Sequence, residues 1–267
     1  MSTFNQAAEK YHTVRKVGKN DQTYLRYFNA FFGDQPINEI TKEQILEAKI
    51  GIKGSAGTKN RYTSFLRAVL IFAYEELGWL DKKPVISNLK VEPRDHKFFT
   101  ADQVDKLHDE LPDHLKGPFI FSLLTGVRMS NCLNLEWEHI KGNKAWINAS
   151  QSKSGRSISI PLCKKAQDLL AGLDKSNKYV FTYAGRKITR ASNTGWYSAL
   201  KRAGLEGYRW HDIRHTWASH HSMNGTPIQA LKTLGGWSDI DIVDKNYSHL
   251  SDDYLTETCE NIDPLVS

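Results

Sequence analysis

The sequence predicts an α+β fold that is mostly helical: a helical domain followed by a domain of helices with a small antiparallel sheet. Two observations support this prediction. Apolar residues recur at three- and four-residue spacing over several long stretches, which is typical of helices packed on one face. Two short stretches, 144–148 and 156–160, instead alternate polar and apolar residues as strands do, with residues 150–155 as the turn between them.

The first domain is expected over residues 1–88, and each element predicted in it is a helix. A glycine follows the second apolar stretch and another follows the fourth, where each would end a helix. The third helix is predicted from the capping-box pattern Thr41-Lys42-Glu43-Gln44. In this pattern, the side chains of Thr41 and Gln44 each accept a hydrogen bond from the other's backbone N–H. The remaining predicted helices cover residues 4–11, 24–32 and 58–77.

A linker is expected over residues 89–98, because this stretch is polar, contains a proline and has no apolar period. The second domain is then expected over residues 99–267. It opens on Thr100-Ala101-Asp102-Gln103, a second capping-box pattern. Apolar spacing in this domain predicts helices over residues 119–124, 164–173, 191–203, 211–223 and 227–234.

Charge and composition narrow the classes of function. The formal net charge is +6, and the basic excess lies before residue 239, since residues 239–267 hold 8 Asp/Glu and one Lys. A polyanion would be attracted to the body and repelled by the end. No apolar run is long enough to span a bilayer, so a cytosolic, nucleoid-associated protein is expected. The cysteines, expected to be unpaired thiols, are Cys132, Cys163 and Cys259.

Three clusters have chemistry in common, because each could hold or attack a phosphate. Arg128 follows a glycine turn in Thr125-Gly126-Val127-Arg128, and guanidinium matches phosphate in two-point geometry. His211 and Arg214 are three residues apart, so on a helix they share a face. Taken singly, each of these residues is more often an ordinary surface group.

The third cluster is Gly235-Gly236-Trp237, followed by Tyr247. An indole N–H is a donor that a phosphate oxygen can accept. A tyrosine phenol has a pKa near 10, so as a nucleophile it needs neighbouring cations. Taken one at a time, Trp237 and Tyr247 are each more often core residues than catalytic ones.

Together, in this order, the clusters resemble the catalytic domain of the tyrosine recombinases, or phage-type integrases. The resemblance extends to the first domain, which looks like their helical core DNA-binding domain, and to the junction Phe99-Thr100-Ala101-Asp102. It implies a site-specific recombinase that cuts and rejoins DNA through a 3′-phosphotyrosine. In the predicted helix 58–77, the DNA-binding candidates are Lys59, Arg61 and Arg67, and the alternative is that they form only the solvated side of this helix.

The resemblance also implies a role for each residue. Tyr247 would be the nucleophile, and Lys153, in the turn of the sheet, would protonate the leaving 5′-oxygen. His211 would assist proton transfer at the tyrosine. The phosphate would be held by Arg128 and Arg214, with donors from His211 and Trp237. No metal and no cofactor is expected.

The implied partner is double-stranded DNA, bound by a homo-oligomer expected to be a tetramer, without a membrane. Accessory directionality or DNA-bending proteins are a further class of partner that the resemblance suggests. Neither the DNA sequence of the target nor the direction of the reaction, whether integration, excision, resolution or inversion, follows from the chain.

The chain departs from the family pattern in two places. Asn131 stands where relatives usually have an acid, three residues after the first arginine. Tyr247 lies ten positions after Trp237, where relatives usually have nine, and Tyr254 is the next tyrosine. Two alternatives therefore stay open: a non-catalytic DNA-binding protein with the same fold, and a DNA-relaxing enzyme like a type IB topoisomerase.

Overall fold

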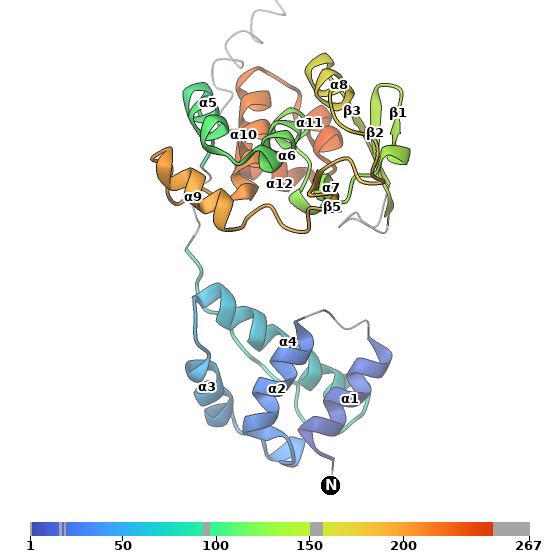
Figure 1. The fold of residues 1–267 in the computed structure, drawn as a ribbon. Coiled ribbons are helices and arrows are strands. Elements are labelled where there is room, and N and C mark those ends of the chain that lie inside the picture. Colours follow the sequence, from blue (N-terminus) through green and yellow to red (C-terminus); the bar gives the residue numbers. More distant parts are fainter. Residues whose placement is uncertain (1, 16–17, 19, 93–96, 150–156, 248–267) are drawn as a thin grey trace, which may run out of the picture. The chain divides into compact units, whose positions relative to one another are not determined.

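The structure is a computed structural model that describes residues 2–15, 18, 20–92, 97–149 and 157–247. The chain divides into two compact units, Met1–Arg94 and Asp95–Ser267. The division falls inside the stretch 89–98 that the sequence analysis assigns to a linker. The predicted fold class is confirmed: the described residues are mostly helical, with small antiparallel sheets (Figure 1).

The first unit is a bundle of helices, and capping residues set where several of them begin. The side chains of Thr3 and Thr41 each accept a hydrogen bond from the backbone N–H three residues on. In return, the side chains of Gln6 and Gln44 accept from the backbone N–H of these threonines. Ser55 caps the longest helix, so this helix begins two residues before the start expected from its apolar face. The elements are α1 (Phe4–Val14), α2 (Asp21–Phe32), η1 (Ile37–Glu39), α3 (Lys42–Gly51) and α4 (Ala56–Glu75).

Aromatic and aliphatic side chains make the core of the first unit. Phe4 and Phe32 meet edge-on with ring centroids 5.7 Å apart, and Phe28 stacks on Phe32 at 6.1 Å. Leu66 and Val69 bring α4 into the same core, and all five side chains are at most 1% exposed. Burying an aromatic side chain removes about 150–250 Å² from water, so this core is the main stabilising feature of the unit.

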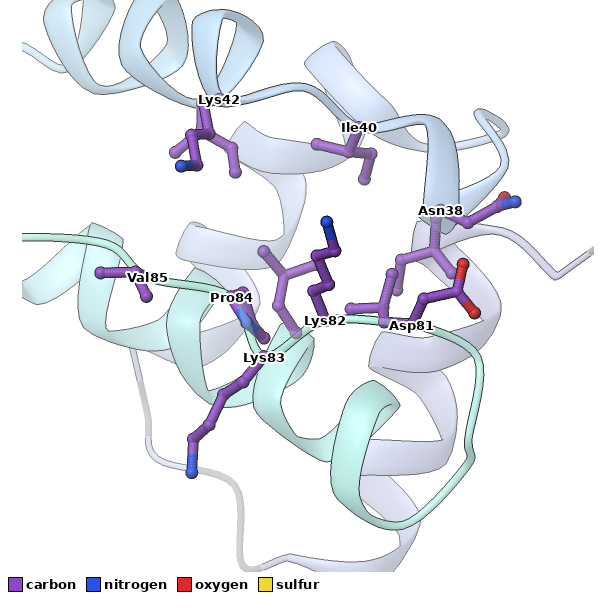
Figure 2. Close-up of a pocket in the computed structure, with 12 residues that line it drawn as sticks. Asn38, Ile40, Lys42, Asp81, Lys82, Lys83, Pro84 and Val85 are labelled. Atoms are coloured by element: carbon purple, nitrogen blue, oxygen red, sulfur yellow. The ribbon is translucent and has the colours of Figure 1, made fainter.

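The segment after α4 returns along the first unit and leaves a hollow of about 380 Å³ (Figure 2). Ile40 and Lys42 line one side of the hollow, and residues 80–85 line the other. Lys82 points into it, whereas Lys83 points away and pairs with Glu75 at 2.7 Å. Among the described residues, none of those predicted to bind phosphate or DNA lines this hollow.

The second unit combines eight α-helices within the described residues with two small sheets. The predicted capping box at Thr100 is present and opens its first helix. The helices are α5 (Ala101–Glu110), α6 (Asp113–Thr125), α7 (Met129–Leu133), α8 (Lys164–Ala171), α9 (Thr194–Arg202), α10 (Trp210–Met223), α11 (Ile228–Gly235) and α12 (Ile240–Tyr247), with the 3-10 turn η2 (Trp137–His139).

The main sheet lies beside α8 in Figure 1 and has the antiparallel order β1 (Ile140–Lys141), β2 (Lys144–Ile147), β3 (Ile158–Pro161). The alternating stretches predicted as paired strands are therefore paired, with Trp146 opposite Ser159. Their predicted turn lies outside the described residues. A second hairpin, β4 (Thr182–Tyr183) with β5 (Arg186–Lys187), was not predicted, because strands of two residues are too short to show an alternating polar and apolar pattern.

Helix α10 lies near the middle of the second unit in Figure 1 and packs against α6. Its residues Trp210 and Ile213 join the main core, and Trp217 and Ala218 join a smaller one. The smaller core also contains Val243 and Tyr247 of α12, so the predicted nucleophile belongs to a packed cluster. Within the described residues, no helix is long and apolar enough to cross a membrane.

Candidate active site

The turn before Arg128 has a conformation that requires glycine. Gly126 caps α6 in the left-handed region, at φ 64°, and a Cβ atom there would overlap the Trp217 ring. Arg128 follows in extended backbone at the start of α7 and is partly buried. Partial burial lowers the pKa of Arg128 from its usual value. Because α7 has five residues, the guanidinium itself, rather than a helix terminus, is the group that could hold an anion here.

Arg214 is buried on α10, 5% exposed, and its side chain is held on three sides. Nη1 donates to the Gly126 carbonyl and Nη2 to the Gly235 carbonyl, both at 2.7 Å. The guanidinium carbon lies 3.9 Å from the centre of the Trp237 ring. Burial first, and then the charge of Arg128, lower the pKa of Arg214 to about 9, so it stays a cation at neutral pH. The two glycine motifs thus orient this arginine.

The Gly235-Gly236-Trp237 motif has a steric explanation. A Cβ on Gly235 would overlap the Trp237 ring, and one on Gly236, which caps α11 at φ 63°, would come 2.5 Å from Ile158. The missing side chain at Gly235 therefore lets the indole fold back toward Arg214, and the one at Gly236 makes room for Ile158 of β3. Trp237 also stacks on Trp217 with ring centroids 6.1 Å apart. The indole forms one wall of the arginine's pocket.

His211 lies in the first turn of α10 and is exposed to solvent. Partial desolvation, followed by the charges of Arg214 and Arg209, lowers the pKa of His211 from its usual value and so favours the neutral imidazole. Arg209 in turn pairs with the buried Asp212 at 2.8 Å, and Asp212 accepts from the Arg209 backbone at 2.7 Å. This capping box fixes the start of α10 and hence the place of His211.

Tyr247 ends α12 and is 2% exposed. Its hydroxyl oxygen lies 2.6 Å from His215 Nδ1, and its backbone carbonyl accepts from Ser222 Oγ at 2.6 Å. Its ring centroid is 6.1 Å from that of Trp237. Burial raises the pKa of Tyr247 to about 12, while the positive charge of Arg214 acts in the opposite direction.

The structure therefore brings five predicted residues into one region: Arg128, His211, Arg214, Trp237 and Tyr247. The charge of Arg128 acts on both His211 and Arg214, and the charge of Arg214 acts on Tyr247. The extra residue between Trp237 and Tyr247 is accommodated, since the two rings are neighbours. The remaining predicted residue, Lys153, lies outside the described residues, as does Tyr254.

Sequence reasoning did not assign a role to His215 or Ser222. The ring nitrogen at hydrogen-bond distance from the phenol belongs to His215, and His211 meets that ring edge-on with centroids 5.0 Å apart. His211, His215 and Ser222 are spaced by four and seven residues, which places them along one helical face. The spacing could have indicated from the sequence that these residues share a helical face. The contact between His215 and Tyr247 could not be read from the sequence, because the two residues are 32 positions apart.

The predicted DNA-binding residues of the first unit differ in their surroundings. Arg61 is exposed on α4, whereas Lys59 donates to the Ile50 carbonyl at 3.0 Å. Arg67 is partly buried and donates to the Ile86 carbonyl and, at 2.8 Å, to Asn88 Oδ1. Arg67 therefore ties the returning segment to α4, which leaves Arg61 as the cation of the three with most freedom to meet a phosphate.

A group of cation-binding residue types also occurs in the described part of the second unit, at Glu136, Glu138 and His139. Glu136 already pairs with Lys178 at 3.1 Å, and His139 Nε2 lies 2.9 Å from the Asn148 amide nitrogen. Of the predicted cysteines, Cys132 is buried and Cys163 exposed, both as thiols. Cys259 lies outside the described residues.

Taken together, the geometry defines a site for phosphate chemistry with a tyrosine. Two guanidinium groups, one partly and one fully buried, could stabilise charge on a phosphate, and a phenol with a hydrogen-bond partner could attack it.

Comparisons with known proteins identify the family and the fold of the chain. Residues 97–253 match the model of the Phage integrase family. The integrase of Salmonella phage P22 is 37% identical over 227 residues, covering 79% of this chain and 58% of that protein. Tyrosine recombinase XerA of Pyrococcus furiosus is 25% identical, covering 94% and 90%. A lambda integrase (75–356) dimer bound to a COC′ core site has the same fold, with TM-score 0.75, 19% identity and coverage of 90% and 97%.

This chain belongs to the phage integrase family. The predicted family is thereby confirmed. The chain spans less than two thirds of the length of the phage P22 integrase that it resembles.

Proposed function

We propose that this chain is a site-specific recombinase that cuts and rejoins double-stranded DNA, with Tyr247 as nucleophile. The observation that supports it most strongly is the placement of Arg214, which is held by two glycine carbonyls and Trp237 next to the phenol. Holding a buried cation in one orientation is costly unless its charge is used. A phosphate drawn to Arg128 and Arg214 would meet the tyrosine at the same place.

In the proposed reaction, the Tyr247 oxygen attacks a backbone phosphorus in line and forms a 3′-phosphotyrosine. The bond to the 5′-oxygen breaks, and Lys153 supplies the proton to this leaving oxygen. Negative charge on the non-bridging oxygens is stabilised by Arg128 and Arg214, with donors from His211 and Trp237. Preorganised donors of this kind contribute about 2.7–4 kcal/mol each when removed singly. Attack by a 5′-hydroxyl then reverses the steps and rejoins the strand.

The proposed partner is double-stranded DNA, held by residues 1–88 and 99–267 together, with a tetramer as the working assembly. Support comes from the solved relatives, since lambda integrase has been captured as a dimer on a core site and as a tetramer on a Holliday junction. The basic excess of the chain before residue 239 favours the same partner. In the first unit, exposed Arg61 would contact the phosphate backbone.

The test is a nicked suicide duplex, in which the short strand 3′ of the cleavage site diffuses away and traps the covalent intermediate. Duplexes tiled from the DNA flanking this chain's own coding sequence are incubated with the protein. A covalent adduct that is lost in Tyr247→Phe is expected, and Tyr254→Phe serves as the matched control that keeps it. Binding without any adduct would instead identify a DNA-binding protein of the same fold.

Exchange between two duplexes separates the recombinase from a relaxing enzyme. We expect strand exchange between two labelled duplexes that carry the same site. Relaxation of supercoiled DNA without exchange would favour the topoisomerase-like alternative.

A further inference from the structure

We propose that His215 is the catalytic base for Tyr247, and that its Nδ1 takes the phenol proton as the oxygen attacks phosphorus. The assignment rests on the proposed function and concerns the same site. It differs from the role expected for His211, which we limit to donating a hydrogen bond to the phosphate.

The first argument is contact. His215 Nδ1 lies 2.6 Å from the phenol oxygen, a distance at which a proton can pass between the two atoms. His211 meets the His215 ring, with centroids 5.0 Å apart and planes at 87°. The solvent-exposed histidine is thus next to the buried one, and the buried one is next to the nucleophile.

The second argument is that α10 holds Tyr247 at two points two helical turns apart. His215 holds the hydroxyl, and Ser222 Oγ donates to the carbonyl of the same tyrosine at 2.6 Å. Val243, fully buried, packs α12 into the small core it shares with Trp217 and Ala218. The phenol is therefore fixed against His215 by its own backbone as well as by its hydroxyl.

The third argument is chemical need. Burial raises the pKa of Tyr247, so the phenol stays protonated at neutral pH and its proton must leave during attack. The neighbouring guanidinium groups are cations that cannot accept a proton, so they cannot serve as the base. His215, 7% exposed and in contact with the oxygen, is the base that the geometry provides.

The proposed step balances as follows. His215 holds its own proton on Nε2, and the phenol proton passes to Nδ1 as the bond from oxygen to phosphorus forms. The bond from phosphorus to the 5′-oxygen breaks, and this oxygen takes a proton from Lys153. On rejoining, the 5′-hydroxyl gives its proton back to Lys153 as it attacks phosphorus, the bond from phosphorus to the tyrosine oxygen breaks, and the imidazolium returns its proton to that departing oxygen.

The experiment compares two substitutions with different chemistry. In His215→Asn, the amide oxygen stands close to the place of Nδ1, so it can still accept a hydrogen bond from Tyr247 but cannot hold a proton. In His215→Ala, both properties are lost. His221→Asn is the matched control, because His221 lies on the same helix and bonds Thr226 through its own Nδ1 at 2.9 Å.

The readout is the single-turnover rate of covalent adduct formation on the nicked suicide duplex, at saturating protein. We expect His215→Asn and His215→Ala to be slower by about 100-fold or more, the usual range for removing a general base. DNA affinity should be unchanged, and imidazole in the buffer should restore part of the rate of the alanine variant. His221→Asn should react within about threefold of the unsubstituted protein.

A duplex with a 5′-bridging sulfur at the cleavage site identifies which proton is affected. A thiolate leaves without protonation, so this duplex should rescue Lys153→Ala but not His215→Asn. Rescue of both would show that His215 acts on the leaving group and would overturn the assignment.

Other results would overturn it as well. A rate near that of the unsubstituted protein in His215→Asn, with a defect only in His215→Ala, would reduce His215 to a positioning residue. Faster cutting in both variants would identify a resting-state latch. If the unsubstituted protein forms no adduct on any flanking duplex, the proposed function itself fails, and the assignment fails with it.

Discussion

The two units of the chain bury very different side chains. In the first, the buried core is almost entirely apolar, with the rings of Phe4 and Phe28 both in contact with that of Phe32. In the second, helix α10 alone buries Asp212, Arg214, His215, Thr216, Ser219 and Ser222. A buried polar group costs stability unless it is paired, and on α10 the side chains of Asp212, Arg214, His215, Thr216 and Ser222 each have a hydrogen-bond partner.

The first unit is therefore stabilised mainly by burial of apolar groups, whereas the second also buries polar groups, which costs stability. The first unit resembles an ordinary helical domain, in which the effect of a substitution follows the apolar area it removes from water. Around α10, the effect of a substitution should instead depend on the orientation and charge of the side chain that is changed. The predictions below separate these two behaviours, beginning with the substitution expected to have the largest effect.

Phe28→Ala should destabilise the first unit by about 3–5 kcal/mol, because it removes a fully buried ring and leaves a cavity. Hydrogen exchange of the full chain, resolved by peptide, should show faster exchange in α1, α2 and α4. Amides of α10 should keep their protection, since α10 belongs to the other unit. Phe31→Ala is the control, because Phe31 is 44% exposed. Equal loss of protection in both units would show that they unfold together.

Arg214→Lys should lower the rate of adduct formation by about 10²–10³-fold, or roughly 2.7–4 kcal/mol in the barrier. Lysine keeps the positive charge but cannot donate to both glycine carbonyls and also lie flat on Trp237. Single-turnover cleavage of the suicide duplex measures the change, with Arg202→Lys, an exposed partner of Glu110, as control. Near-normal cutting would mean that charge alone, without orientation, is sufficient at this site.

How much of this was predictable depends on the range of the interaction. Thr41 and Thr100 predicted capping boxes correctly, because both partners lie within four residues. Helix α12 was not predicted, since a short segment carrying Asp241 and Asp244 resembles a polar loop. Its apolar positions acquire meaning only when they pack on α10.

The candidate site divides in the same way. The order of its motifs was visible, but the acceptor of Arg214 in the first glycine turn lies 88 residues away in sequence. The phenol's partner is 32 residues away, so His215 and the alternative His211 could not be ranked from spacing. Local patterns predict which residue types are present, and tertiary packing decides which of them meet.

Tyr247 should make the protein less stable at alkaline pH. Its folded-state pKa of about 12 lies above the ordinary value of 10.0, so above pH 10 the folded protein holds a proton that the unfolded chain has lost. Unfolding is favoured under these conditions, and between pH 9 and 11 the loss is on the order of 1 kcal/mol. Urea unfolding of the unsubstituted protein minus that of Tyr247→Phe isolates this loss. A difference that does not change with pH would show that the phenol ionises normally in the folded protein.

The smallest effects are expected for the arginines of α4, where stability and DNA binding should separate. Arg67→Ala should destabilise the first unit by about 1 kcal/mol, because it releases the Ile86 carbonyl and Asn88. Arg61→Ala should change stability by less than about 0.5 kcal/mol, since Arg61 is exposed. It should instead reduce the slope of log affinity against log salt by about 0.9, the loss of one phosphate contact. Urea unfolding and DNA binding at several salt concentrations measure the two. A changed salt slope in Arg67→Ala but not in Arg61→Ala would reverse the roles that the structure supports.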